Sequence, residues 1–355
     1  MTLTQNIDEA RLGALVEQAV GDFGSALQAA LVVVGDRLGL YRGLAEGGSQ
    51  TPAELAARTG TVERNVREWL AAQAAGGYVH FDGDGRYSLS PEQTEALTNA
   101  DSPAFLIGGF QAMTAAAKAD EKLTDAFRTG TGVGWHEHHH DLFHGTERFF
   151  RPGYKANLVQ SWLPALDGVV AKLDAGATVA DVGCGFGAST IIMAEAFPAS
   201  TFVGFDYHEP SVDAARKEAA AAGVGDRARF EVAAAKAYGG SGYDLVCYFD
   251  CLHDMGDPVG ALAHTRRALA DDGTVLLVEP YAGDTVADNL TPVGRVYYAA
   301  SSLICTPASQ SQEVGRALGA QAGEAQLRAV AEEAGFTRIR RAAETPFNLV
   351  LELRR

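Results

Sequence analysis

The chain has 355 residues, of which 47% are hydrophobic and 21% charged, and its formal net charge at pH 7 is −16. This length allows two domains with a large apolar core. The negative charge argues against nonspecific binding to nucleic acid or to an anionic membrane surface, because both need a positive field. The four cysteines form no C-x-x-C pair and no disulfide framework, and the chain shows no signal peptide and no membrane-length apolar run. These features predict a cytoplasmic protein.

The first 100 residues predict a helical domain that ends in a hairpin. Apolar residues recur at helical spacing over residues 8–47. In "TPAELAARTG", Thr51 and Glu54 predict a capped short helix, and a second helix is expected over residues 62–75. The stretch "YVHFDGDGRYSL" then predicts two strands around a Gly-rich turn. Helix, turn, helix and hairpin in this order are typical of a winged helix.

A winged helix suggests DNA binding, but the charges of this one argue against that function. Residues 1–100 hold 7 basic and 13 acidic side chains. In the second helix, Glu63 and Glu68 offset Arg64 and Arg67, whereas a DNA reader needs a basic face. A module that serves dimerisation and pocket building is therefore favoured, and nucleic-acid binding is not expected.

The rest of the chain predicts an α/β fold. Residues 101–175 are expected to form helices and loops, and from residue 176 strands alternate with helices, which predicts a parallel sheet. The expected strands are 177–183, 200–206, 228–233, 243–250 and 273–280. The expected helices are 187–197, 210–222, 257–270 and 321–335, with an insertion over 281–320. The final "FTRIRRAAETPFNLVLELRR" predicts two strands and a short turn, so the last strand should be antiparallel. The predicted fold is a Rossmann-like sheet over 176–355, preceded by the winged-helix domain (1–100) and a pocket-building linker (101–175).

The stretch "TVADVGCGFGAST" predicts a cofactor loop. An apolar strand ends at Asp181, and Gly183, Gly185 and Gly187 then allow a sharp turn and the close approach of a ligand at a helix N-terminus. The spacing suits either a dinucleotide or S-adenosylmethionine. The next strand ends in Asp206, whose carboxylate can accept the ribose hydroxyls of either cofactor. The terminal antiparallel hairpin and "CLHDMGDP" after the fourth strand favour S-adenosylmethionine.

With "DVGCGFG", "VGFD", "CLHDMGDP" and "FNLVLELR" in this order, the chain resembles a class I S-adenosylmethionine-dependent methyltransferase. It is most similar to bacterial small-molecule methyltransferases with an N-terminal winged-helix dimerisation domain, which implies a homodimer. By this resemblance, cofactor binding is expected at Asp181, Gly183, Cys184, Gly185, Gly187, Asp206, Tyr207, Phe249 and Asp250. Ala234 stands where many members place an acid for the adenine amino group, so packing or backbone groups are expected to hold adenine.

The resemblance also implies catalytic residues. His253 matches the general base of winged-helix O-methyltransferases, and Glu279 matches the carboxylate that orients this base. An alcohol or phenol is a poor nucleophile while protonated, and histidine can take its proton. Asp254 is expected to cap the next helix or to support the loop. Met255-Gly256 replaces the Trp that usually follows the His-Asp pair, so C- or N-methylation stays open beside O-methylation.

The run "WHEHHHDLFH" holds five of the nine histidines. His136, His140 and His144 have the spacing of one helix face, and with a nearby carboxylate they could bind a metal. Three glycines before the run argue against a continuous helix there, so a wall or lid of the substrate pocket is favoured and no metal site is assigned. The expected pocket residues are Trp135, His136, His140, Phe150 and Tyr154.

The sequence therefore predicts a methyltransferase for a small, apolar or aromatic acceptor. Three alternatives stay open. The first is a winged-helix transcriptional regulator with a cofactor-sensing domain. The second is a metal-assisted C-methyltransferase that uses the histidines of residues 136–144. The third is a nicotinamide-dependent oxidoreductase. The identity of the acceptor is not predicted.

Overall fold

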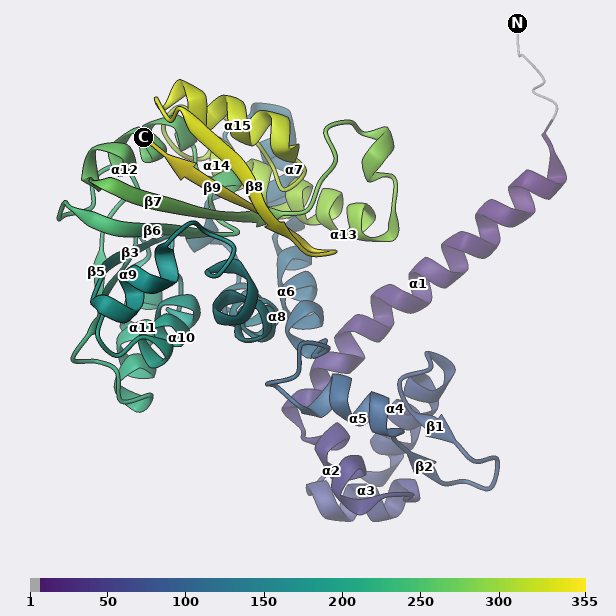
Figure 1. Cartoon of the computed structure of the whole chain (residues 1–355). Coiled ribbons are helices and arrows are strands. Elements are labelled where there is room, and N and C mark those ends of the chain that lie inside the picture. The colour runs from purple at the N-terminus through teal and green to yellow at the C-terminus, as the bar shows by residue number, and fades with distance from the viewer. Residues whose placement is uncertain (1–6) are drawn as a thin grey trace, which may run out of the picture. The chain divides into compact units, whose positions relative to one another are not determined.

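The computed structural model describes residues 7–355, which divide into two compact units with a boundary between Thr114 and Ala115 (Figure 1). This boundary lies inside the expected linker segment. The first unit contains α1 (Glu9–Arg37), α2 (Leu40–Gly47), α3 (Pro52–Thr59), α4 (Glu63–Ala75), β1 (His80–Phe81), β2 (Tyr87–Ser88) and α5 (Pro91–Thr98), and α6 (Ile107–Ala116) crosses the boundary. The strands β1 and β2 pair in antiparallel register, so the predicted helix–turn–helix–hairpin order is confirmed.

Local sequence signals fix the helix starts of this unit. Thr51 and Ser90 cap α3 and α5, and each forms a complete capping box with Glu54 and Gln93, respectively. The indole of Trp69 on α4 donates to the carbonyl oxygen of Leu31 at 2.9 Å, which fastens the C-terminal part of α1 to the core. The helices of this unit therefore pack around α4.

The N-terminal part of α1 carries exposed apolar side chains. Leu15, Val20, Phe23 and Leu27 are 62–72% exposed. By length and composition alone α1 could also cross a membrane. The sequence prediction overlooked this property, because Glu17 and Asp22 interrupt the apolar run. Among the described residues of its unit, none covers these exposed side chains of α1.

The second unit is a three-layer α/β structure. Its helices are α7 (Asp120–Thr129), α8 (Asp141–Asn157), α9 (Val169–Ala175), α10 (Ala188–Ala196), α11 (Glu209–Ala221), α12 (Pro258–Ala268), α13 (Pro292–Ala300), α14 (Thr306–Gln310) and α15 (Gly323–Glu333). Its strands are β3 (Thr178–Val182), β4 (Thr201–Asp206), β5 (Ala228–Val232), β6 (Tyr243–Phe249), β7 (Leu269–Pro280), β8 (Arg338–Glu344) and β9 (Asn348–Arg354). Short turns of 3-10 or π helix are η1 (Ala117–Ala119), η2 (Trp135–Glu137), η3 (Leu158–Trp162), η4 (Leu252–Asp254), η5 (Ala287–Asn289) and η6 (Ser301–Cys305).

The seven-stranded sheet has the order β5-β4-β3-β6-β7-β9-β8. The first five strands of this order are parallel, and the last strand, β9, is antiparallel, as predicted. Its position between β7 and β8 was not predicted. Alternate side chains of each strand point to opposite faces. Val179 and Leu245 pack in the core beneath α9, α10 and α11, whereas Ala180 and Val246 pack beneath α12 and α15 (Figure 1). The sheet is covered on both faces, so its functional groups gather at the strand ends.

The segment 281–320 is an insertion, as predicted, and it contains α13, η6 and α14. Several bonds tie it to the turn after β6. Ser309 Oγ donates to the carbonyl oxygen of Met255 at 2.8 Å, and Gln312 Nε2 donates to that of Asp254 at 2.9 Å. A Cβ on Gly256 would lie 2.5 Å from Gln312 Cβ, so only glycine lets the two segments approach this closely.

Candidate active site

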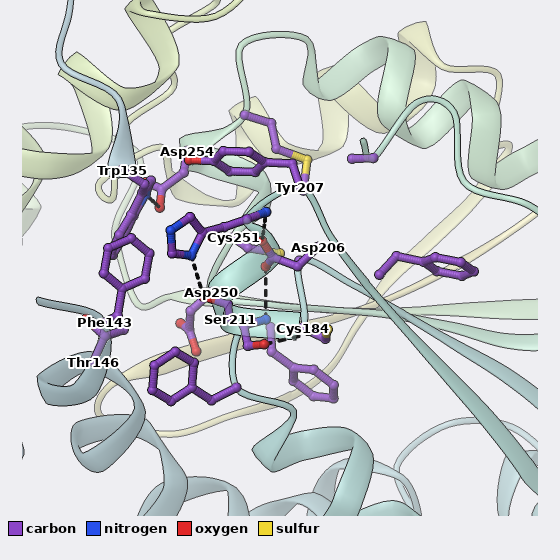
Figure 2. Close-up of a pocket in the computed structure, with 18 of the residues that line it drawn as sticks. Trp135, Phe143, Thr146, Cys184, Asp206, Tyr207, Ser211, Asp250, Cys251 and Asp254 are labelled. Carbon is purple, nitrogen blue, oxygen red and sulfur yellow. Dashed lines mark hydrogen bonds between the residues drawn. The ribbon is translucent and has the colours of Figure 1, made fainter. Parts of the chain in front are cut away.

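A cavity of about 460 Å³ opens at the carboxyl ends of β3, β4 and β6 (Figure 2). This is the edge at which open α/β sheets bind ligands. The lining comes from the glycine loop, the ends of β4, β5 and β6, one face of α8, and residues 134–136 and 311–312. All of these residues belong to the second unit, so this unit alone forms the cavity.

The glycine loop is held to the end of the neighbouring strand. The backbone N–H groups of Gly183 and Cys184 both donate to the carbonyl oxygen of Phe205, at 2.8 and 3.1 Å. Gly183 has φ +76°, and a Cβ there would lie 2.8 Å from Cys251 Sγ. Glycine is therefore required both by the backbone conformation and by the close approach of the turn after β6.

Asp206 lies at the cavity wall as expected (Figure 2). Its Oδ2 accepts the N–H of Gly185 at 3.0 Å and its Oδ1 accepts the N–H of His208 at 2.9 Å. Burial raises the pKa of this carboxyl, and the two N–H donors oppose that rise. Each carboxylate oxygen has a further lone pair for a ligand hydroxyl. Asp206 can thus bind a ribose while it fixes the loop.

Asp181 was expected to bind the cofactor, but its side chain does not face the cavity. Its side chain is buried and does not line the cavity. Its Oδ2 accepts the hydroxyl groups of Ser189 and Thr190, both at 2.6 Å, and burial raises its pKa to about 6. Asp181 fastens the start of α10 behind the loop, and its contribution to a ligand is indirect. Gly187 also lies outside the lining, at the entrance to the same helix.

The remaining expected cofactor residues, Cys184, Tyr207, Phe249 and Asp250, line the cavity. So do Ala233, Ala234 and Ala235, which give the stretch after β5 the apolar surface that packing against adenine requires. Four carboxyl residues, Glu147, Asp206, Asp250 and Asp254, line the cavity, and no lysine or arginine does so among the described residues. A lining that offers carboxyl groups and no cationic side chain among the described residues fits a cationic sulfonium donor. The residues present therefore fit S-adenosylmethionine.

One face of α8 forms an aromatic wall. Phe143, Glu147, Phe150 and Tyr154 line the cavity at helical spacing. Tyr154 stacks on Phe150 and donates its hydroxyl to Asp250 Oδ2 at 3.1 Å. The sequence analysis missed Phe143 and Glu147, although their spacing to Phe150 and Tyr154 could have revealed them. Phe143 also stacks on His208, with ring centroids 4.4 Å apart.

The histidine run divides among different environments. Trp135 and His136 line the cavity, as predicted, but His140 lies outside it with its side chain 74% exposed. The assignment of His140 to the pocket is therefore wrong. The metal alternative required His136, His140 and His144 to share a helix face, and the preceding glycines argued against such a helix. The structure has no such shared face, because α8 begins only at Asp141 and residues 135–137 form a separate turn. His144 instead contacts the ring of Phe186.

His253 lies on the turn η4, directly after β6. Its side chain is 5% exposed, and its Nδ1 is hydrogen-bonded to Oε2 of Glu279 at the end of β7. The other oxygen of Glu279 accepts the N–H of Leu252 at 2.9 Å, so the carboxylate is held by the turn that it supports. Burial lowers the pKa of His253, but Glu279 and Asp254 raise it, and the net result lies well above the usual value.

His253 does not itself line the cavity, although Asp254 does. Asp254 Oδ1 lies 3.2 Å from Nε2 of His253. The sequence expectation that Asp254 caps the next helix is wrong, because Asp257 caps α12 by accepting the N–H of Gly260. Cys305, from η6 of the insertion, is the third group against His253 and Asp254. The sequence analysis gave no role to Cys305, which lies 52 positions further along the chain.

Two family models match the chain. A "Methyltransferase domain" matches residues 180–275, and an "Rv2258c-like winged HTH domain" matches residues 26–99. The O-demethylpuromycin-O-methyltransferase of Streptomyces alboniger is 29% identical over 317 residues, which cover 84% of this chain and 78% of the relative. A mitomycin 7-O-methyltransferase structure has a TM-score of 0.70 at 22% identity and covers 98% of this chain and 100% of its own. Human N-acetylserotonin methyltransferase, in complex with S-adenosylmethionine, has a TM-score of 0.71 at 17% identity, and 99% of each chain is covered.

The sheet order, the glycine loop and Asp206 define the class I fold of S-adenosylmethionine-dependent methyltransferases, preceded by a winged-helix domain. The chain is accordingly an S-adenosylmethionine-dependent methyltransferase. The nicotinamide-dependent alternative is set aside by these matches.

Proposed function

We propose that this enzyme methylates a hydroxyl group of a small, apolar or aromatic molecule, with His253 as the general base and Glu279 as the residue that orients it. The observation that carries this proposal is the clamp of Glu279, which bonds Nδ1 of His253 with one oxygen and the N–H of Leu252 with the other. A base fixed by a carboxylate is the arrangement expected where a hydroxyl must lose its proton.

When bound, S-adenosylmethionine supplies an electrophilic methyl group on a sulfonium. The methyl group would pass to the acceptor oxygen as its bond to sulfur breaks, which leaves S-adenosylhomocysteine, and the acceptor proton would pass to His253. Glu279 then stabilises the imidazolium through Nδ1 and later the proton leaves to solvent. The pKa of His253 lies well above its usual value, so activity should rise as pH increases through that pKa, because only the neutral ring accepts a proton.

The nature of the lining supports an apolar or aromatic acceptor. Trp135, Phe143, Phe150 and Tyr154 contribute rings to the cavity lining. Figure 2 shows Trp135 and Phe143, whose rings are in contact. Aromatic rings stack favourably on flat apolar molecules. The four carboxyl residues of the lining disfavour an acceptor that carries a negative charge.

The direct test is the His253→Ala variant. We expect its turnover to fall by roughly 10²–10⁴-fold, the range of general-base catalysis, while its affinity for S-adenosylhomocysteine stays unchanged by calorimetry. Calorimetry is informative because His253 does not line the cavity. Turnover on hydroxyl acceptors at the wild-type rate would remove His253 as the base.

The alternative of a DNA-binding regulator finds no support in α4. Arg67 pairs with Glu63 at 2.6 Å and Arg64 pairs with Glu68, so both arginines are neutralised on their own helix. Of the alternative metal ligands in the histidine run, only His139, His140 and Asp141 come together, on a partly exposed turn. We therefore favour metal-independent methyl transfer and no nucleic-acid partner.

We further propose a cytoplasmic homodimer that pairs through α1. The exposed residues Val16, Val20, Phe23, Leu27 and Val34 recur at intervals of three, four or seven along α1, a spacing typical of helix pairing. A membrane span is disfavoured, since each buried acid would cost roughly 2.5–3.5 kcal/mol. A Phe23→Glu/Leu27→Glu double variant should be monomeric by light scattering. A dimer that survives both charges would exclude this face.

A further inference from the structure

Three segments that are distant in the sequence meet around Asp254. The turn that carries Asp254 is bonded to Ser309 and Gln312 of the insertion. The loop before η2 is bonded to the same insertion, because the N–H of Val133 donates to the carbonyl oxygen of Pro307 at 3.0 Å. Gly132 lies so close that a Cβ there would be 2.2 Å from that oxygen. The cavity wall and the turn of His253 are therefore both fastened to α14.

Trp135 connects this wall to Asp254. Its indole Nε1–H donates to Asp254 Oδ2 at 2.9 Å, and the dashed line in Figure 2 marks this bond at the edge of the cavity. The ring of Phe143 packs edge-on against Trp135, with centroids 5.7 Å apart. The other oxygen of Asp254 lies 3.2 Å from Nε2 of His253. A continuous chain of contacts thus runs from the cavity wall through Asp254 to the base and on to Glu279.

We propose that Trp135 and Asp254 are positioning residues for His253: the indole holds Asp254 against Nε2, so that the base is flanked by a carboxylate on each side. The inference rests on the proposed role of His253. It also explains why Met255 and Gly256, and not a tryptophan, follow His253 and Asp254. The aromatic group beside the pair comes from Trp135, and Gly256 leaves room for the insertion.

The expected direction of the effect follows from the charges around His253. The groups that face it are Glu279 from β7, Asp254 from its own turn, Cys305 from η6 and Asp250 at the end of β6. Glu279 and Asp254 favour the protonated ring. Burial raises the pKa of Asp254, whereas the bond from Trp135 is among the contacts that lower it and keep the carboxylate charged.

Loss of the indole N–H therefore lowers the proton affinity of His253 by either of two routes. Asp254 loses part of its charge, or it moves away from Nε2. Both routes leave the imidazole with a weaker negative environment, so its titration shifts toward lower pH.

The test is the titration of His253 in the free enzyme by NMR, with its resonance assigned by its absence in His253→Ala. Asp254→Asn should move the midpoint down by about 1 pH unit, and Trp135→Phe by about half of that. Phe143→Leu is the matched control, because it alters the same wall without a bond to Asp254. The pH at which turnover is half-maximal should move in the same order.

The outcomes separate the inference from the function on which it rests. An unshifted midpoint in both Trp135→Phe and Asp254→Asn, with unchanged thermal unfolding, overturns the inference even if His253→Ala is inactive. Equal shifts in Trp135→Phe and Phe143→Leu would assign the effect to wall packing and likewise overturn it. Full turnover of His253→Ala would overturn the proposed function, whereas the NMR shifts would stand.

Discussion

The cofactor wall of the cavity comprises residues 183–186, 205–208 and 233–235, which follow three neighbouring strands in chain order. The histidine wall lies at and behind the cavity lining around His253. It comprises residues 132–137, 250–256 and 305–312, three segments that the fold alone brings together. The contacts of the cofactor wall join the ends of adjacent strands, as between Gly185 and Asp206. In the histidine wall, Trp135 acts on Asp254 across 119 positions. The difference shows that a cofactor site can be encoded locally while the adjoining catalytic site is not.

Asp206→Ala should break the cofactor wall and gives the largest of the three effects that test this comparison. The variant loses the ribose acceptor and the bond that holds Gly185, so the affinity for S-adenosylhomocysteine should fall by roughly 10–100-fold. Isothermal calorimetry measures this directly. Asp226→Ala is the control, since the Asp226 side chain is 77% exposed. An unchanged affinity would contradict the assignment of Asp206.

Gly183→Ala tests the junction between the two walls. Gly183 and Gly223 have similar φ values of +76° and +71°, but only the Cβ at 183 would meet a side chain, that of Cys251. Both alanine variants therefore carry similar backbone strain. The difference between their free energies of unfolding measures the clash of the new Cβ with Cys251. We expect Gly183→Ala to lose about 1–3 kcal/mol more of the free energy of unfolding than Gly223→Ala, measured by urea denaturation. Equal losses would show that the walls do not constrain each other.

Asp250→Asn tests the histidine wall through the pH dependence of thermal stability, and it should give the smallest of the three effects. Burial, followed by the charge of Glu279, raises the pKa of Asp250 to about 8. A carboxyl with a raised folded-state pKa stabilises the fold in full below its unfolded pKa of about 3.9, and this contribution is lost as pH rises through the folded value. Wild-type Tm should therefore fall as pH rises from about 4 to about 8 and should level off above that.

The asparagine variant should show a flatter Tm profile over this range, because its side chain does not ionise. The raised pKa of His253 contributes a decline of the same sign, and that part should remain in the variant. Asp226→Asn serves as the exposed control. A Tm profile of Asp250→Asn that parallels wild type would mean that Asp250 is charged throughout the range.

The sequence predicted those parts of the molecule that short segments determine. The strand ends at Asp181 and Asp206, the glycine loop and the antiparallel position of β9 follow from apolar patterning and turn residues. The pairing of His253 with Glu279 was implied by the resemblance to winged-helix O-methyltransferases, and the structure places the two side chains in contact.

Other features depend on tertiary packing and could not be predicted in this way. The burial of His253 behind Asp254 results from the insertion, whose path the pattern of residues 281–320 does not define. The exposure of His140 results from a break between η2 and α8 that leaves the ring outside the helix face. The bond from Trp135 to Asp254 joins two loops, and loops carry no periodicity that would align them.

The position of β9 between β7 and β8 has a consequence for biosynthesis. The strand β7 ends at Pro280, yet its partner β9 begins only at Asn348, so β7 presents an unpaired edge until the later segment has been made. The residues Val275 to Val278 on that edge are all buried in the finished sheet. An apolar edge of this kind is a template for pairing with other chains. The yield of native enzyme therefore depends on how well this edge is protected from other chains until β9 has been made.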